Sequence, residues 1–204
     1  GDDKGLVLPP KVAPIQVVIV PIYKSNEAKE IVFPKLNEIR EQLELKKIRV
    51  HVDDRSELTP GYKFNDWELK GVPLRIEIGP KDIEKQQVIL AKRYNREKIS
   101  IGFGEIEKIV TILDEIQKDM LKIARVKAKE KTVNISDYAE FKSKIGVGGF
   151  FNAYWCGKVE CEEKIKEETG ADIRVIPFGS ENTGGKCIYC QGQSIATPIF
   201  ARGY

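Results

Sequence analysis

The chain has 204 residues, 41% of them hydrophobic, and its formal charge is only +3 because 34 Lys and Arg balance 31 Asp and Glu. A chain of this length can bury one core of moderate size or two small ones. No apolar run approaches the roughly 20 residues of a membrane-spanning helix, and the first residues lack the basic-then-apolar pattern of a signal peptide. Four cysteines are too few for a disulfide-dense secreted module, so these features favour a cytoplasmic protein.

The first part of the chain predicts strands that alternate with helices. Residues 16–20 form a continuous apolar run typical of a buried strand, and residues 49–52 predict a second strand. Between them Ser25 can cap a helix, which Pro34 could kink or delay. The expected apolar face of this helix consists of Ile31, Leu36, Ile39, Leu43 and Leu45. Residues 1–14, which are marked by prolines, are expected to be an extended linker.

Residues 60–78 predict a helix followed by a strand. Pro60 and Gly71 bracket the helix, since Pro is favoured in the first turn and Gly just past the last. Residues 74–78 alternate apolar and charged side chains, which is typical of a strand.

This helix and strand bring three complementary side chains together. Phe64 and Glu68 lie one turn apart on one helix face, and Arg75 is expected on the polar side of the strand. An aromatic ring, a carboxylate and a guanidinium can stack on an unpaired base and hydrogen-bond to it. The alternative is an amphipathic unit in which Trp67 and Leu69 are merely core residues, and for Trp67 we favour this alternative.

Two further patterns complete the first predicted domain. Residues 88–91 and 99–101 predict a hairpin. Residues 104–127 predict a helix, because apolar residues recur at steps of three and four. Its apolar positions are Ile106, Ile109, Leu113, Ile116, Met120 and Ile123. Strands that alternate with helices predict an α/β domain over residues 15–127, with a mixed sheet flanked by helices.

Basic residues outnumber acidic ones in two stretches of this domain. The count is six against three over residues 81–98, and six against two over residues 118–131. A basic patch is the usual footprint of a phosphate-binding surface. A solvated helix face explains the second stretch equally well.

Residues 128–204 predict a small α+β domain. A connection with a short helix at 137–143 ends in a glycine cluster at 146–149, where a hinge or tight turn is favoured over a phosphate cradle because no Lys-Ser/Thr follows. The other predicted elements are a strand at 150–155, a helix at 160–169, and strands at 173–178 and 195–201. A domain of this size has a small core, so a crosslink would be useful.

The cysteines supply a candidate crosslink. Cys156-x4-Cys161 and Cys187-x2-Cys190, with 25 residues between the pairs, have the two-plus-two form of a structural zinc site. A thioredoxin-like site is the first alternative, and it would require the second pair, Cys187 and Cys190, to begin a helix. The residues that follow this pair are a poor helix start. Buried free thiols are the other alternative. His51, the only histidine, is expected on a strand surface and not among the ligands.

The order of these features resembles prolyl-tRNA synthetase of the archaeal and eukaryotic type. The sequence GDDKGLVLPPKVAP at residues 1–14 is similar to the end of that family's catalytic domain, just past class II motif 3. The sequence PGYKF at residues 60–64, the four cysteines and the terminal tyrosine follow in the family's order. The resemblance covers essentially the whole chain. It implies an anticodon-binding domain at 15–127 and a zinc-binding C-terminal domain at 128–204.

The resemblance also implies an activity and its partners. The full-length family enzyme is a class II ligase and a homodimer, and it attaches proline to proline tRNA in an ATP-dependent two-step reaction. Its ATP, Mg²⁺ and proline sites belong to a catalytic domain upstream of Gly1, so this fragment alone is expected to form no prolyl-adenylate. Tyr204 is expected either to lie towards that catalytic domain or to be a frayed end.

The implied anticodon site is specific for guanine, the second and third anticodon base of proline tRNAs. By motif position, the resemblance assigns stacking to Phe64 and base-edge contacts to Glu68 and Arg75, with Lys81 and Asp82 completing the pocket. A carboxylate matches the donors of guanine, and Arg matches its O6 and N7 acceptors.

Two points stay open. The role of Lys98 is unassigned, because the length of the preceding turn leaves its register open.

A free-standing RNA-binding module, or a structural accessory domain of a tRNA-handling complex, is the alternative function. The absence of an initiator Met at Gly1 favours the truncated enzyme. No Ser/His/Asp or exposed Cys/His set supports a hydrolase or an oxidoreductase.

Overall fold

The computed structural model describes residues 1–180 and 184–203. The chain divides into two compact units, Gly1–Ile123 (unit 1) and Ala124–Tyr204 (unit 2). Tyr204, for which a place near a catalytic domain was one expectation, lies outside the described residues. No helix in the described part of the chain is long and apolar enough to cross a membrane.

Unit 1 is built on a mixed five-stranded sheet in the order β2-β1-β3-β4-β5. The strands are β1 (Val17–Pro21), β2 (Val50–Val52), β3 (Leu74–Ile78), β4 (Gln87–Lys92) and β5 (Lys98–Gly102). β1 is parallel to β2 and β3, whereas β4 is antiparallel to β3 and β5. The helices are α1 (Asn26–Leu45), α2 (Pro60–Leu69), α3 (Pro80–Glu84) and α4 (Lys108–Glu130), with a 3₁₀ turn η1 (Phe103–Glu105), and the last residues of α4, from Ala124 on, belong to unit 2. The predicted mixed sheet is confirmed.

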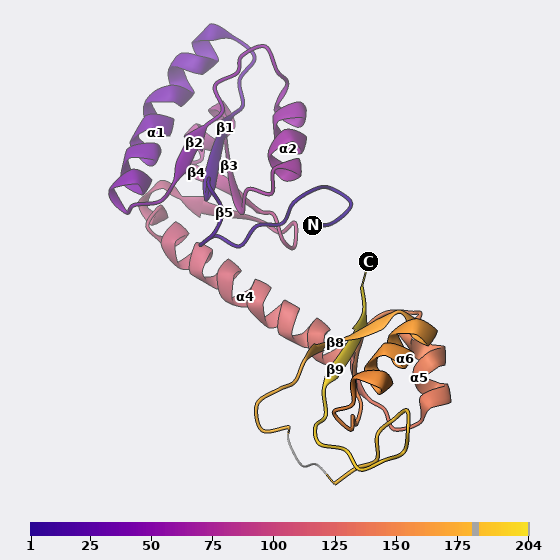
Figure 1. The fold of residues 1–204 in the computed structure, drawn as a ribbon. Coiled ribbons are helices and arrows are strands. Elements are labelled where there is room, and N and C mark those ends of the chain that lie inside the picture. Colours follow the sequence, from indigo (N-terminus) through magenta and orange to yellow (C-terminus); the bar gives the residue numbers. More distant parts are fainter. Residues whose placement is uncertain (181–183, 204) are drawn as a thin grey trace. The chain divides into compact units, whose positions relative to one another are not determined.

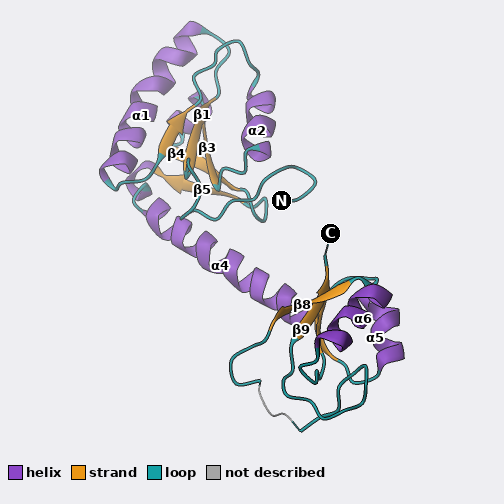
Figure 2. Ribbon diagram, in the orientation of Figure 1, coloured by secondary structure: helices purple, strands orange, loops and turns teal. Residues whose placement is uncertain are grey.

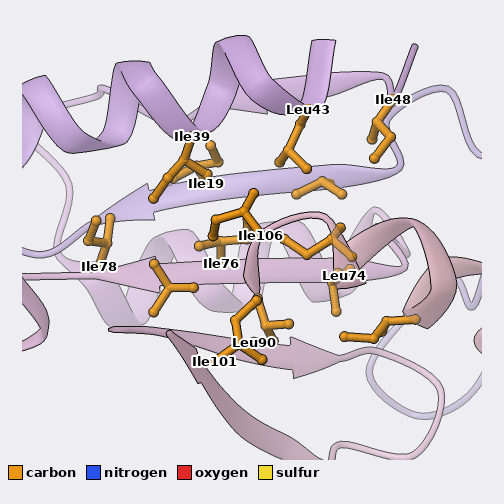
Figure 3. Close-up of a cluster of buried hydrophobic side chains, with 14 of the residues drawn as sticks. Ile19, Ile39, Leu43, Ile48, Leu74, Ile76, Ile78, Leu90, Ile101 and Ile106 are labelled. Atoms are coloured by element: carbon orange, nitrogen blue, oxygen red, sulfur yellow. The ribbon is translucent and has the colours of Figure 1, made fainter. Parts of the chain in front are cut away.

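The two faces of the sheet pack against different helices. On one face, Val17 and Ile19 of β1 pack with the buried residues of α1 and the first half of α4, and Figure 3 shows this cluster. On the other face, Val18 and Val20 pack with Trp67 of α2. α1 and α2 therefore lie on opposite sides of the sheet, as Figure 1 shows. Because both faces are covered, β1 is apolar along its whole length.

Helix α1 begins as predicted but presents a different face. The Ser25 side chain accepts a hydrogen bond from the Ala28 backbone N–H at 3.3 Å, which confirms the cap. The prediction of Ile31 and Leu45 as core residues is wrong, since they are 53% and 83% exposed. Val32 is buried in place of Ile31, because positions 32, 36, 39 and 43 follow the helical repeat.

Helix α4 differs from its prediction at both ends. Residues 103–105 form η1, so the α-helix starts only at Lys108. Ile109, Leu113 and Ile116 are buried as predicted. Ile123, the last of the apolar positions that indicated this helix, is 42% exposed. The core cluster of unit 1 takes in only the first half of α4, with Met120 packed at its edge.

Unit 2 has a four-stranded sheet in the order β6-β7-β9-β8. Its strands are β6 (Thr132–Asn134), β7 (Phe150–Asn152), β8 (Ala171–Val175) and β9 (Ile199–Arg202), and its helices are α5 (Tyr138–Ile145) and α6 (Val159–Thr169). Figure 2 shows that loops make up much of this unit. The strands are shorter than predicted, and Phe178, expected in a strand, is fully exposed. Phe141 is the centre of the core, with ring centroids 5.8 Å from Phe151 and 5.7 Å from Phe200.

Candidate functional site

Helix α2 is positioned by its ends and by one aromatic side chain. The Thr59 hydroxyl accepts a hydrogen bond from the Tyr62 backbone N–H at 3.3 Å, and Pro60 opens the helix. Gly71 follows with a φ of 73°, a conformation that favours glycine. Trp67 is buried on the sheet, which confirms that it is a core residue. Leu69 is exposed, so the alternative in which it is also a core residue is wrong.

A buried carboxylate after β2 holds α2 in place. Asp53 accepts hydrogen bonds from Trp67 Nε1 at 2.7 Å and from Arg55 Nε at 2.8 Å. Lys63 Nζ donates to the Asp53 carbonyl oxygen at 3.1 Å. Burial alone would raise the pKa of Asp53, but the hydrogen bonds from Arg55 and Trp67 outweigh it and lower the pKa to about 2. This network was not predicted, because its one local signal in the sequence is a run of charged residues directly after a strand.

The predicted trio is assembled around Arg75. The Arg75 guanidinium carbon lies 4.1 Å from the centroid of the Phe64 ring, and Arg75 Nη1 donates to Glu68 Oε1 at 3.2 Å. Arg75 lies on the charged side of β3, and that side is buried, since Arg75 is only 7% exposed. Its face of β3 is the one that α2 covers, and Glu77 on the same face accepts from Arg75 Nε and Nη2 at 3.1 and 2.9 Å.

Lys98 joins this cluster from β5. Its Nζ lies 2.8 Å from Glu77 Oε1 and 5.6 Å from the centroid of the Phe64 ring. A cavity of about 180 Å³ adjoins the cluster. Its charged lining includes Glu68, Arg75, Arg93, Arg96 and Lys98, and its apolar lining includes Val18, Trp67 and Val72. Six of its ten lining residues are charged, so this cavity suits a polar ligand group better than an apolar one.

Arg93 ties the last turn of α2 to the first residues of the chain. Its Nε donates to the Glu68 carbonyl oxygen at 2.9 Å, and its Nη1 and Nη2 donate to the Asp2 carboxylate at 2.8 and 2.6 Å. The Arg93 hydrogen bonds hold the pKa of Asp2 well below its ordinary value. The Leu6 backbone N–H also donates to the Leu69 carbonyl at 3.0 Å, so the first residues pack on unit 1 beside the cluster.

Lys81 and Asp82 lie in α3, past the end of β3. Asp82 Oδ2 accepts from the Gly79 backbone N–H at 2.9 Å and thus caps its own helix. Among the described residues, no hydrogen bond or ion pair joins either side chain to the cluster around Arg75. The structure therefore brings together Phe64, Glu68 and Arg75, and the roles of Lys81 and Asp82 stay predictions.

In unit 2 the four cysteines converge. The sulfur atoms of Cys156, Cys161, Cys187 and Cys190 all lie within 4.8 Å of one another. The sulfur of Cys156 is 3.5 Å from that of Cys161 and 3.7 Å from that of Cys190. A tetrahedral Zn²⁺ with Zn–S bonds of about 2.3 Å requires sulfur separations of about 3.8 Å. The donor set and its spacing therefore fit one metal ion.

Two backbone turns present these thiols. Cys161 lies in the first turn of α6, and Gly157 precedes the helix with a φ of 82°. The second pair spans a turn closed by a hydrogen bond from the Cys187 backbone N–H to the Gly192 carbonyl at 2.8 Å. Cys190 ends a turn at residues 188–190 and no helix follows it, which contradicts the thioredoxin-like alternative. His51 is exposed in β2 and contacts the Trp67 ring, outside the cysteine cluster.

The thiols differ in their tendency to ionise. Burial raises the pKa of Cys161 and of Cys156. The Gly192 backbone N–H lowers the pKa of the exposed Cys190 to about 7. A bound cation would favour the thiolate form of all four, because metal ligation requires deprotonated sulfur.

Comparison with known families accounts for both units. A family model described as an anticodon binding domain matches residues 16–113. A model described as the C-terminal part of prolyl-tRNA synthetase matches residues 138–204. The chain belongs to the prolyl-tRNA synthetase family. Its two units correspond to that family's anticodon-binding domain and C-terminal domain, which favours part of the enzyme over a free-standing RNA-binding module.

Curated relatives and solved structures agree. The chain is 50% identical over 206 residues to a proline–tRNA ligase from Acetoanaerobium sticklandii, covering 42% of it, and 47% identical over 205 residues to one from Cenarchaeum symbiosum, covering 43%. A crystal structure of Cryptosporidium parvum prolyl-tRNA synthetase, complexed with L-proline and AMP, superposes with a TM-score of 0.89 at 40% identity. That alignment covers all of this chain and 44% of the Cryptosporidium chain. The chain thus spans a little over two fifths of the length of these relatives.

Proposed function

We propose that unit 1 reads guanine in the anticodon of proline tRNA, on behalf of an enzyme that attaches proline to that tRNA with ATP. The observation that carries this proposal is the placement of Arg75, stacked on Phe64 and paired with Glu68 beside a small cavity. These are the three side chains that a base reader of this kind needs: a ring, a carboxylate and a guanidinium.

Each group has a distinct part in reading the base. Glu68 accepts hydrogen bonds from the N1 and N2 donors of guanine, and Arg75 donates to O6 and N7. Phe64 stacks on the base. Glu68 and Arg75 form an ion pair in the structure. When guanine binds, this one contact is replaced by two contacts to the base, one from each side chain. Lys81 and Asp82 complete the pocket, a role supported by the family resemblance.

We also propose that unit 2 holds one structural Zn²⁺ through Cys156, Cys161, Cys187 and Cys190. The convergence of four sulfur atoms with suitable spacing supports this assignment. Zn²⁺ crosslinks two turns when it is bound, and four protein ligands leave no open position for catalysis. The chain itself supplies the thiolates and the tight turns.

The remaining assignments come from the family. Proline, ATP and Mg²⁺ bind to the catalytic domain of the full-length enzyme, which acts as a homodimer in the cytoplasm. The relatives named as proline–tRNA ligases, and the neighbour complexed with L-proline and AMP, support this part of the proposal.

The base-reading proposal is tested by binding of synthetic anticodon stem-loops. The probes are the proline tRNA stem-loop and two variants, each with one anticodon guanine replaced by adenine. We expect Glu68→Ala and Arg75→Ala each to lower discrimination by about 1–3 kcal/mol, since each removes a matched charged contact to a base edge.

Lys122→Ala is the matched control on α4. A lost phosphate contact should weaken all three stem-loops alike and reduce the salt dependence of binding. If Glu68→Ala and Arg75→Ala behave in this way, or change nothing, the cluster does not read bases.

A further inference from the structure

The two edges of the Arg75 guanidinium have different partners. Nε and Nη2, which form one edge, both donate to Glu77 Oε1, at 3.1 and 2.9 Å. On the other edge, formed by Nη1 and Nη2, one hydrogen bond to a described residue is present, from Nη1 to Glu68 at 3.2 Å. A guanidinium can bind one partner along one edge and a second, planar partner along the other, because its donors form a rigid fork.

Glu77 and Glu68 differ in how firmly the fold holds them. Glu77 lies in β3 opposite Val20 of β1 and Ile89 of β4, so hydrogen-bonded strands flank it on both sides. Its side chain is 8% exposed. Glu68 lies in the last turn of a ten-residue helix, and its side chain is 32% exposed. Glu77 is therefore the fixed partner of Arg75, and Glu68 is the partner that can move.

Lys98 balances the charge of the fixed partner. Its Nζ lies 2.8 Å from Glu77 Oε1 and donates to Oε2 at 2.9 Å, so two cations share one buried carboxylate. Departure of Glu68 from Arg75 thus leaves no buried carboxylate unpaired. A buried ion pair persists only when its charges and hydrogen bonds stay satisfied, and Glu77 meets that condition with or without Glu68.

We propose that Glu77 is a positioning residue for guanine recognition: it holds Arg75 over Phe64 by one edge and leaves the other edge free for O6 and N7. This inference rests on the proposed anticodon function. In this arrangement the base displaces Glu68, and Arg75 stays in place. Without the Glu77 charge, Glu68 is the one carboxylate left to Arg75, and the two base-reading groups neutralise each other.

The test uses the whole chain and measures the guanine-over-adenine preference with the stem-loops described above. We expect Glu77→Gln to lower this preference about tenfold through weaker binding of the guanine stem-loop, because a bidentate base contact contributes on the order of a factor of ten or more. Binding of the adenine variants should stay within about twofold. Glu38→Gln is the matched control, since Glu38 also pairs with a lysine but lies on α1, which covers the other sheet face.

The possible outcomes distinguish the positioning role of Glu77 from base reading by Arg75. If Arg75→Ala abolishes the preference and Glu77→Gln leaves it intact, the positioning role is overturned and base reading by Arg75 stands. If Glu77→Gln weakens all stem-loops equally, Glu77 only supports the fold, and the inference is likewise overturned. If Arg75→Ala leaves the preference unchanged, base reading by Arg75 fails and the positioning role fails with it.

A second measurement covers the case in which Glu77→Gln fails to fold. In the unsubstituted chain, the Arg75 Nε–H resonance, assigned with Arg75→Lys, should stay protected from solvent exchange when the guanine stem-loop binds. The Nη resonances should shift on binding. Loss of Nε–H protection on binding would show that Arg75 leaves Glu77, contrary to the proposal.

Discussion

Units 1 and 2 differ in what holds their functional groups. Among the described residues, the main core cluster of unit 1 has eighteen buried hydrophobic side chains, and that of unit 2 has nine. In unit 1 the charged cluster around Arg75 lies on a sheet that this core already supports. In unit 2 two of the four cysteines are themselves fully buried or nearly so. From this comparison we expect unit 2 to depend on its cysteine cluster for stability, and unit 1 to be stable without the charged cluster.

Removal of the metal should produce the largest difference in stability between the two units. Chelation of the bound ion should unfold unit 2 and leave unit 1 folded, because structural zinc sites contribute about 10–16 kcal/mol of binding free energy to folding. Amide hydrogen exchange, resolved by segment before and after Ala124, measures this difference. Metal analysis should find one zinc per chain, and zinc added back should restore protection. Reduced, metal-free protein that keeps its protection in unit 2 would contradict the assignment.

Shortening one buried side chain in each core should also show that unit 2 tolerates less loss of stability than unit 1. Phe141→Ala in unit 2 should cost about 3–5 kcal/mol, and Leu36→Ala in unit 1 about 2–5 kcal/mol, because both side chains are fully buried. We expect the first change to unfold unit 2 even with metal present and the second to lower only the melting temperature of unit 1. Scanning calorimetry with metal present compares the two transitions. Phe178→Ala, at an exposed aromatic of unit 2, is the control and should leave both unchanged.

The smallest expected effect is acid sensitivity in unit 1. The pKa of Asp53 is about 2 in the folded chain against an ordinary value of 3.8, so its ionised form stabilises the fold above about pH 4. This contribution, about 2 kcal/mol, is lost as the pH falls towards 2. Asp53→Asn should therefore lose less stability than the unsubstituted chain over this range.

Trp67 fluorescence in a Trp155→Phe background reports on unit 1 alone, since Trp155 belongs to unit 2. Urea unfolding at several pH values then gives the free energy of unfolding for both chains. Equal losses in the two chains would show that Asp53 does not carry the acid sensitivity.

Local signals explain what the sequence could predict. Pro60 and Gly71 mark the ends of α2 by their own backbone preferences, and the structure has the helix at Pro60–Leu69. The cysteine spacing predicted a cluster because two short turns bring each pair together, and the structure confirms the convergence. These features depend on neighbours in sequence.

Other features depend on residues far apart in the chain. The alternation in β3 placed Arg75 on the polar side of the strand, but it gave no sign that α2 covers that side, so the burial of Arg75 and Glu77 and their pairing were not predicted. Glu77 has no sequence signal that distinguishes it from a surface carboxylate. β6 was missed because its three residues form a strand only by pairing with β7.

The contact between Arg93 and Asp2 also bears on the order of folding. It joins residues 91 positions apart, and closing a loop of that length costs on the order of 4 kcal/mol in chain entropy. The sheet must therefore form before this contact can persist. During synthesis, Asp2 leaves the ribosome long before Arg93, so Asp2 and the Glu68 carbonyl have no Arg93 to bind until strands β1 to β4 have been made.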